Sequence, residues 1–268
     1  MMGLGTELLR YEGAEFQDRP RTLRLNGESM RFASGTAPHS LAQVLDHYEG
    51  LCERRDGQLS EQVQVLLSRD GELEQPTRGW TSATLREESE HQGFVACLDM
   101  GEATVESEDL LERFARFSRS MDLRDLGELR YVYGEESDGA THFVTFWTEG
   151  SFSVARMFPA KGDAPGFDVE GVLRPPNGRR ILSTREEGHP QAMVMYAGSP
   201  KTARELEQFY ERTLPEAGWS VIDTARTGRW APRELGRLVV AERGASMITI
   251  VLEDGSGQGG TATLFASR

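Results

Sequence analysis

The chain has 268 residues and carries 30 lysines and arginines against 43 aspartates and glutamates, for a net charge of −13. Nucleic acids and anionic membrane surfaces attract positively charged proteins, so this charge argues against both as partners. The hydrophobic share of 38% is enough for globular cores, and the length suits one large domain or two of ordinary size.

Residues 1–21 are expected to form an N-terminal extension. They lack the basic-then-apolar layout of a secretion signal, and no apolar run in the chain approaches the roughly 20 residues of a membrane span. The doubled Met1 and Met2 would be explained by a removed signal or anchor, which predicts a periplasmic or envelope-anchored protein. Without such a signal, the expected compartment is the cytoplasm.

Two later stretches share one pattern, and the sequence predicts that each is a copy of the same unit. The first copy covers 22–160 and the second covers 191–268, with a linker rich in glycine and proline at 161–190. The stretch "MRFASG" and a proline precede the first helical pattern, as "MVMYAG" and a proline precede the second. Weak matches follow in the same order in both copies.

The second copy shows the pattern most clearly. The run "AMVMYAG" ends in glycine and predicts a strand. Ser199 and Pro200 predict a helix start, with the serine as N-cap. Apolar residues then recur at helical spacing: Ala203, Leu206, Phe209 and Tyr210. Pro215 and Gly218 predict the helix end, and four short strands are expected after it.

The expected fold class is therefore α+β, with two related repeats. In each repeat one helix packs across an antiparallel sheet, because neither the helix stripe nor one sheet face is stable in water. The first repeat is expected to carry insertions near 56–78 and 103–133, the second of which adds an extra helix.

The inserted helix, "SEDLLERFARFSRSMD", is strongly amphipathic. Its apolar stripe consists of Leu110, Leu111, Phe114, Phe117 and Met121. We expect this stripe to pack in the core, and a partner-docking face is the alternative. The arginines opposite the stripe and those of the linker turn "RPPNGRR" make up a candidate partner surface: Arg113, Arg116, Arg119, Arg174, Arg179 and Arg180.

Cys52 and Cys97 are the only cysteines. An even pair is compatible with one disulfide in an oxidising compartment. Two buried thiols that pack as small apolar residues fit the sequence equally well. Two cysteines alone cannot hold zinc, and the sequence contains no spacing that supplies the missing ligands.

The sequence contains no recognisable catalytic, cofactor or metal motif. Gly255, Gly257 and Gly260 have the spacing of a dinucleotide-binding loop, but a strand rather than a helix follows them, which favours a hairpin tip. The chain also lacks a His-Glu-x-x-His pair and a nucleophile elbow. We therefore predict no catalytic residue, no cofactor and no metal ligand. His91 and His142 are the candidates for a site assembled from scattered residues.

The run "YAGSPKTARELEQFYERTLPEAGW" resembles a pattern in uncharacterised exported bacterial proteins. The tandem plan is similar to the helix-grip domains in a lipoprotein subunit of the outer-membrane protein assembly machinery. This resemblance covers architecture and one short motif per half, and it implies no catalytic residues. The first half departs from it at His47, which stands where the second half has Phe209.

Three functions follow as hypotheses. The leading one is a non-enzymatic protein-binding or scaffold protein of the bacterial cell envelope, with another protein as partner, because the duplicated unit lacks a convergent polar constellation. The alternative is a small-ligand carrier with an apolar cavity between helix and sheet. The third is a hydrolase with an unrecognised site. The sequence leaves the oligomeric state open.

Overall fold

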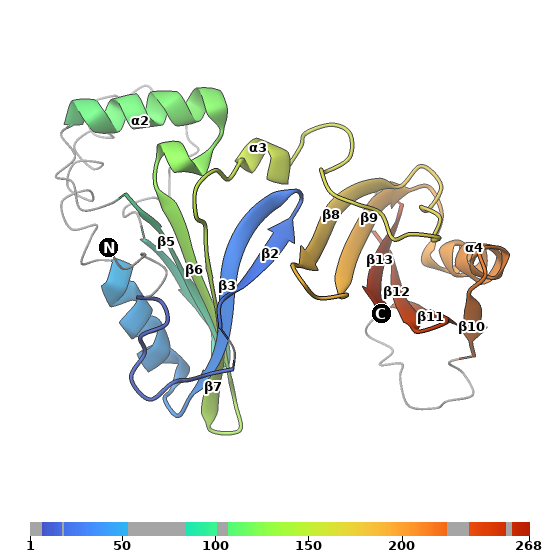
Figure 1. The fold of residues 1–268 in the computed structure, drawn as a ribbon, viewed down its shortest axis with the longest axis horizontal. Helices are drawn as coiled ribbons and strands as arrows, with labels where there is room; N and C mark the ends of the chain where they lie inside the picture. Colours follow the sequence, from blue (N-terminus) through green and yellow to red (C-terminus); the bar gives the residue numbers. More distant parts are fainter. Residues whose placement is uncertain (1–6, 18, 53–83, 101–106, 224–235, 256–258) are drawn as a thin grey trace. The chain divides into compact units, whose positions relative to one another are not determined.

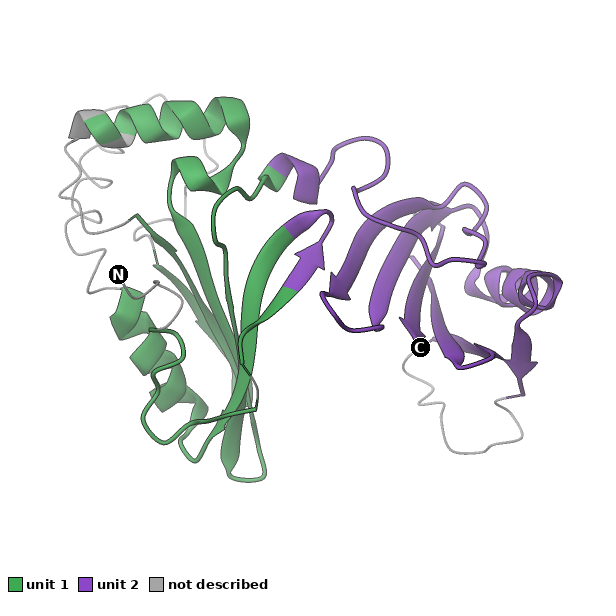
Figure 2. Cartoon of the chain, in the orientation of Figure 1, with its two compact units in different colours: residues 1–22, 29–154 green, residues 23–28, 155–268 purple. Residues whose placement is uncertain are grey.

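The computed structural model describes residues 7–17, 19–52, 84–100, 107–223, 236–255 and 259–268. Within these ranges the chain is α+β, with helices and a 13-stranded antiparallel sheet (Figure 1). The chain divides into two compact units (Figure 2). Unit 1 holds residues 1–22 and 29–154, and unit 2 holds residues 23–28 and 155–268.

The sheet of unit 1 has the strand order β2-β3-β7-β6-β5-β4, and β1 pairs with the end of β3. Its strands are β1 (Glu15–Phe16), β2 (Arg21–Leu25), β3 (Glu28–Ala37), β4 (Thr84–Glu88), β5 (Gln92–Asp99), β6 (Glu128–Ser137) and β7 (Ala140–Trp147). Asp138 and Gly139 join β6 to β7 with φ angles of 55° and 77°. Two consecutive positive φ angles are typical of the tight hairpin turn that sets strand register.

A helix over residues 41–52 follows β3 and covers one face of this sheet. Val44 and Tyr48 are fully buried there with Phe143 and Trp147. Leu8, ahead of β1, belongs to the same core, and its carbonyl oxygen accepts a hydrogen bond of 3.0 Å from the Tyr48 hydroxyl. The predicted N-terminal extension therefore contains a residue of the unit 1 core.

Unit 2 has the strand order β8-β9-β13-β12-β11-β10, and residues 23–25 of β2 pair with β8. Its further strands are β8 (Arg179–Glu186), β9 (Ala192–Ser199), β10 (Ser220–Ile222), β11 (Arg237–Arg243), β12 (Ser246–Asp254) and β13 (Gly260–Ser267). The four strands expected after the second helix are thus present, together with one that the sequence analysis missed.

Helix α4 (Ala203–Glu216) covers one face of the unit 2 sheet. The predicted N-cap was wrong: Thr202, not Ser199, caps the helix, and its side chain exchanges hydrogen bonds with Glu205 in a capping box. Ser199 is buried at the end of β9. The predicted stripe is correct in its main members, because Leu206 and Tyr210 are fully buried. Gly218, with a φ of 83°, lets the chain turn into β10.

The sheet is larger than the sequence predicted. Strand β8 lies inside 161–190, the stretch predicted as a linker. Its buried positions carry Arg180 and Ser183, which are satisfied by hydrogen bonds rather than by apolar packing. The alternation of apolar and polar residues that identifies a strand is therefore weak in this segment.

The extra helix is α2 (Ser107–Ser120), which lies between β5 and β6 and is followed by the short helix η2 (Leu123–Asp125). Its apolar stripe was expected to be buried. In the structure Leu111 is 51% and Phe114 is 38% exposed, so this part of the stripe is not in the core. Helix α3 (Val154–Met157) contains the point in the sequence at which unit 1 ends and the second part of unit 2 begins. None of the helices in the described ranges is long and apolar enough to cross a membrane.

Candidate binding site

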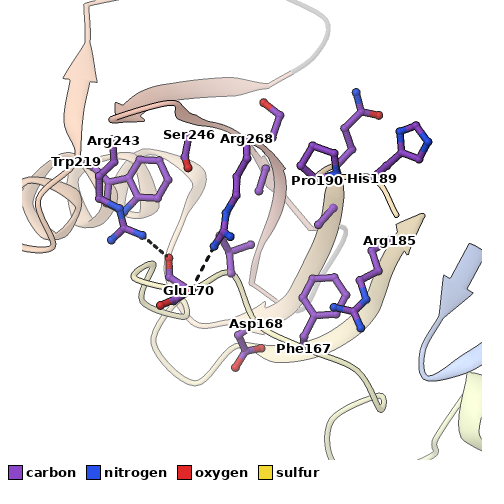
Figure 3. Close-up of a pocket in the computed structure, with 15 residues that line it drawn as sticks. Phe167, Asp168, Glu170, Arg185, His189, Pro190, Trp219, Arg243, Ser246 and Arg268 are labelled. Atoms are coloured by element: carbon purple, nitrogen blue, oxygen red, sulfur yellow. Dashed lines mark hydrogen bonds and ion pairs between the residues drawn. The ribbon is translucent and has the colours of Figure 1, made fainter. Parts of the chain in front are cut away.

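Two strand connections and one strand end meet at one end of the unit 2 sheet. The β8–β9 connection, the β11–β12 turn and the last residues of β13 lie there, because neighbouring strands run in opposite directions. Together with a loop at 167–170 and Trp219 they enclose a hollow of about 400 Å³ (Figure 3). We call it the arginine hollow, because Arg185, Arg243 and Arg268 line it.

Aromatic rings form the wall of the arginine hollow. The Trp219 indole is buried, and its Nε1–H donates a hydrogen bond of 2.9 Å to the Gly171 carbonyl. The Arg243 guanidinium lies 4.6 Å from the centre of the Trp219 ring, and the Arg185 guanidinium lies 5.4 Å from that of Phe167. Stacking on a ring holds each cation in place without consuming its N–H donors.

A network of hydrogen bonds around Asp168 fixes the loop that closes the hollow. The Asp168 carboxylate accepts hydrogen bonds from Arg174 at 2.7 Å, from Arg180 at 2.5 Å and from the Tyr196 hydroxyl at 2.8 Å. Burial would raise the pKa of Asp168, but the hydrogen bonds from Arg174, Tyr196 and Arg180 outweigh it and hold this pKa below its usual value. The negative charge of Asp168 is therefore already neutralised within unit 2.

The remaining charge in the arginine hollow is positive. Glu170 is the other carboxylate in its lining, and it accepts a hydrogen bond of 3.3 Å from Arg268. Both side chains are highly exposed, at 83% and 68%, so this pair contributes little to stability and can exchange for another partner. Arg243 also donates to the Glu170 backbone carbonyl at 3.3 Å (Figure 3). The hollow can therefore accept a carboxylate from outside.

An apolar groove adjoins the arginine hollow on the sheet face opposite α4. Val194, Leu264 and Ile248 point toward α4, and the residues next to them in β9, β13 and β12 point the other way. We call this hollow of about 360 Å³ the open groove, and its side chains include Leu23, Thr184, Met193, Met247, Thr249 and Phe265.

The open groove and the arginine hollow share lining residues, Arg185 and Gln191 among them. Met247 is 48% and Phe265 is 45% exposed, which is high for large apolar side chains on a sheet. The two hollows are thus adjacent, with an apolar surface next to a cluster of cations.

The arginines of the predicted partner surface belong to both units, three of them to unit 1 and three to unit 2. Arg174 and Arg180 belong to the hydrogen-bond network of Asp168, and Arg180 is only 8% exposed. Arg180 is therefore an internal residue of unit 2. Arg179 lines a different hollow, of about 560 Å³.

The predicted arginines of unit 1 lie on α2. Arg113 donates a hydrogen bond of 3.1 Å to the Met100 carbonyl, and Arg116 forms an ion pair of 2.9 Å with Glu112. Arg119 is exposed. The sequence thus showed the arginine-rich segments. It did not show the arginines that line the arginine hollow, because these lie far apart in the sequence, in or next to three different strands.

Cys52, Cys97, His91 and His142 all belong to unit 1. Cys52 and Cys97 form a disulfide that ties the helix over 41–52 to β5. His142 Nδ1 lies 3.1 Å from the Thr36 hydroxyl, and His91 is highly exposed beside Glu90. Within the described ranges, no three His, Cys, Asp or Glu side chains are grouped as metal ligands would be. Comparisons with protein-family models, curated proteins and solved structures gave no match.

Proposed function

We propose that the two units are copies of one binding module. In unit 1 the strands follow the order β2-β3-β7-β6-β5-β4, and in unit 2 they follow β8-β9-β13-β12-β11-β10. When the six strands of each list are ranked by their order along the chain, both lists read first, second, sixth, fifth, fourth, third. A helix also follows β3, as α4 follows β9. On this comparison β6 corresponds to β12 and β7 to β13, so the addition to unit 1 is the stretch of α2 and η2.

Side-chain burial supports the same correspondence. Tyr48 and Tyr210 stand ten residues after Pro38 and Pro200, and both are fully buried. Val44 and Leu206, each six residues after its proline, are fully buried as well. Equal spacing of buried residues on two helices is expected when both helices pack on the same kind of sheet.

We further propose that the chain is a non-enzymatic protein-binding protein. The layer between α4 and its sheet is solid, because Leu206, Tyr210 and Leu214 are at most 1% exposed. A carrier with an apolar cavity between helix and sheet would need space there. Unit 2 instead leaves apolar surface accessible in the open groove, and accessible apolar patches mark protein-interaction sites.

The proposed occupant of this site is a protein segment that presents apolar side chains next to an acidic group. The apolar part would lie in the open groove against Met193, Met247 and Phe265. The carboxylate would reach the arginine hollow and replace Glu170 as the partner of Arg268. Charge complementarity supports this assignment, because an apolar groove without neighbouring arginines would accept any apolar segment.

A phage-displayed peptide library, panned on the purified protein, tests this proposal. We expect the enriched sequences to combine apolar residues with aspartate or glutamate. The double variant Arg185→Gln/Arg268→Gln should bind the selected peptides at least about tenfold more weakly, since a charge-assisted hydrogen bond contributes on the order of 1.5 kcal/mol. Arg237→Gln is the matched control, because it removes an exposed arginine of unit 2 that pairs with Glu207 away from the site. Enrichment of basic or purely polar peptides would contradict the proposal.

A carrier of small carboxylates is the second candidate, and the volume of the arginine hollow favours it. At about 400 Å³ the hollow lies within the usual size range of small-molecule sites. Calorimetric titration with succinate and citrate separates the two candidates. Tight binding of either acid, together with failure to enrich any peptide, would favour the carrier over the protein-binding function.

A location in the bacterial cell envelope is also a proposal. The disulfide between Cys52 and Cys97 supports an oxidising compartment, because the cytosol keeps protein thiols reduced. Fractionation of the native organism with an antibody to this chain tests the location directly. Recovery in the cytosol would contradict it.

A further inference from the structure

Four aromatic side chains form a row across the unit 1 sheet. Phe32 on β3 stacks with Phe146 on β7 at a centroid distance of 6.0 Å. Phe146 lies 6.1 Å from Tyr131 on β6, and Tyr131 lies 5.5 Å from Phe94 on β5. We call this set the aromatic row.

The aromatic row lies on the face that the helix over 41–52 leaves uncovered. Alternate residues of a strand point to opposite faces, and the neighbours Ala33, Val132 and Trp147 are buried in the core under that helix. The residues of the row are only partly buried, although core packing is the usual place for a cluster of aromatic side chains. Unit 1 thus presents partly accessible aromatic rings on this face of its sheet.

Unit 1, which carries the aromatic row, has a negative net charge. Unit 1 carries 14 arginines against 28 aspartates and glutamates, whereas unit 2 has 16 basic and 15 acidic residues. The nearly balanced charge of unit 2 means that the acidity of the chain resides in unit 1. A basic ligand would therefore be attracted to unit 1 over distances of about a Debye length.

Carboxylates also stand at the margin of the row itself. Glu87 lies opposite Phe94 in the β4–β5 register, Glu135 lies opposite His142 in the β6–β7 register, and both are exposed. At the other end, the Arg21 guanidinium lies 4.5 Å from the centre of the Phe32 ring. The row therefore already binds one guanidinium of its own chain, by the interaction that a foreign arginine would use.

We infer that the uncovered face of unit 1 is a docking site for an arginine-rich segment of a protein partner. Its guanidinium groups stack on Phe146, Tyr131 and Phe94, and the carboxylates at the margin pair with the charges that remain exposed. Arginine suits this surface better than lysine, because its planar group stacks on rings while keeping its donors free. The site is separate from the acidic-segment site of unit 2 and does not depend on it.

The test uses three fluorescein-labelled peptides that alternate valine with arginine, lysine or glutamate. By fluorescence anisotropy we expect the arginine peptide to bind most tightly, the lysine peptide more weakly and the glutamate peptide not at all. The affinity should fall as salt is raised, because the margin charges are exposed. The double variant Tyr131→Leu/Phe146→Leu should bind the arginine peptide about tenfold more weakly, since leucine keeps an apolar side chain at each position and removes the ring.

Charge variants distinguish the site from general attraction to an acidic protein. Glu87→Gln/Glu135→Gln should weaken binding of the arginine peptide about threefold, while Glu112→Gln on α2 removes a carboxylate elsewhere on unit 1 and should leave it unchanged. The inference fails if the leucine variant binds like the parent protein, or if Glu112→Gln weakens binding as much as the margin changes do. Arg185→Gln/Arg268→Gln in unit 2 should have no effect on this peptide.

Discussion

Two buried tyrosines, Tyr48 and Tyr210, each stand ten residues after a proline but differ in one hydrogen bond. Tyr48 donates its hydroxyl proton to the Leu8 carbonyl, whereas the fully buried Tyr210 hydroxyl lacks a hydrogen-bond partner in the part of the chain that the structure describes. Burial raises the pKa of both hydroxyls far above the usual value, so both stay protonated at neutral pH.

The difference predicts that replacement by phenylalanine has different effects on stability at the two positions. Tyr48→Phe should lower the free energy of unfolding by about 1–2 kcal/mol, because it leaves a buried carbonyl without its donor. Tyr210→Phe should leave stability unchanged or raise it by up to about 1 kcal/mol, because it removes a polar group that was buried without compensation. Urea unfolding monitored by circular dichroism measures both variants. Equal losses would show that the Tyr210 hydroxyl has a partner in the folded protein.

Sequence reasoning identified the charged segments but not the residues of the candidate site. Arg174 and Arg180 attracted attention because they are close together in an acidic chain. Their partners, Asp163 and Asp168, precede them on a loop that folds back, so these arginines are neutralised internally. The arginine hollow instead combines side chains from several separated strand ends, and only the strand order brings them together.

At the scale of elements, the disulfide is the strongest local constraint on unit 1. It joins the helix over 41–52 to β5 across 45 residues of sequence. A cross-link of this loop length restricts the unfolded chain and is expected to contribute about 4 kcal/mol. Cys52→Ser/Cys97→Ser should therefore lower the free energy of unfolding by roughly this amount, measured by urea unfolding.

Thiol titration provides the control for the disulfide prediction. Protein denatured without reductant should contain no thiol that reacts with Ellman's reagent, and protein treated with reductant should expose both cysteines. Detection of two free thiols before reduction would mean that Cys52 and Cys97 act as small apolar residues instead, and the double serine variant would then be destabilised far less.

The sequence predicted the elements whose buried positions are apolar. α4 was found because Leu206 and Tyr210 repeat at helical spacing, and β11 to β13 were found because their core positions carry valine, isoleucine and leucine. β8 was missed because hydrogen bonds replace apolar packing at its buried positions. The α4 N-cap was misplaced because serine before proline is a favourable start, and only the structure shows that Thr202 and Glu205 form the capping box.

At the scale of the whole molecule, charge is distributed unevenly between the two units. Unit 1 has a net charge of −14 and unit 2 of +1. Repulsion among like charges destabilises a compact state, and salt screens it, because the Debye length falls from about 30 Å at 0.01 M to about 3 Å at 1 M ionic strength. Unit 1 should therefore gain stability with salt, whereas unit 2 should be almost indifferent.

Scanning calorimetry of the full chain tests this asymmetry. We expect two unfolding transitions, since the chain forms two compact units, and sodium chloride should raise the melting temperature of one by several degrees while moving the other little. Reductant identifies the unit 1 transition, because the disulfide lies in that unit. Chloride is preferable to sulfate, which strengthens apolar burial in any protein and would raise both transitions. If salt raises both transitions equally, or if the reductant-sensitive transition is the one that does not respond to salt, self-repulsion within unit 1 is not what limits its stability. The acidic field that steers a basic partner to the aromatic row would then be weaker than the net charge suggests.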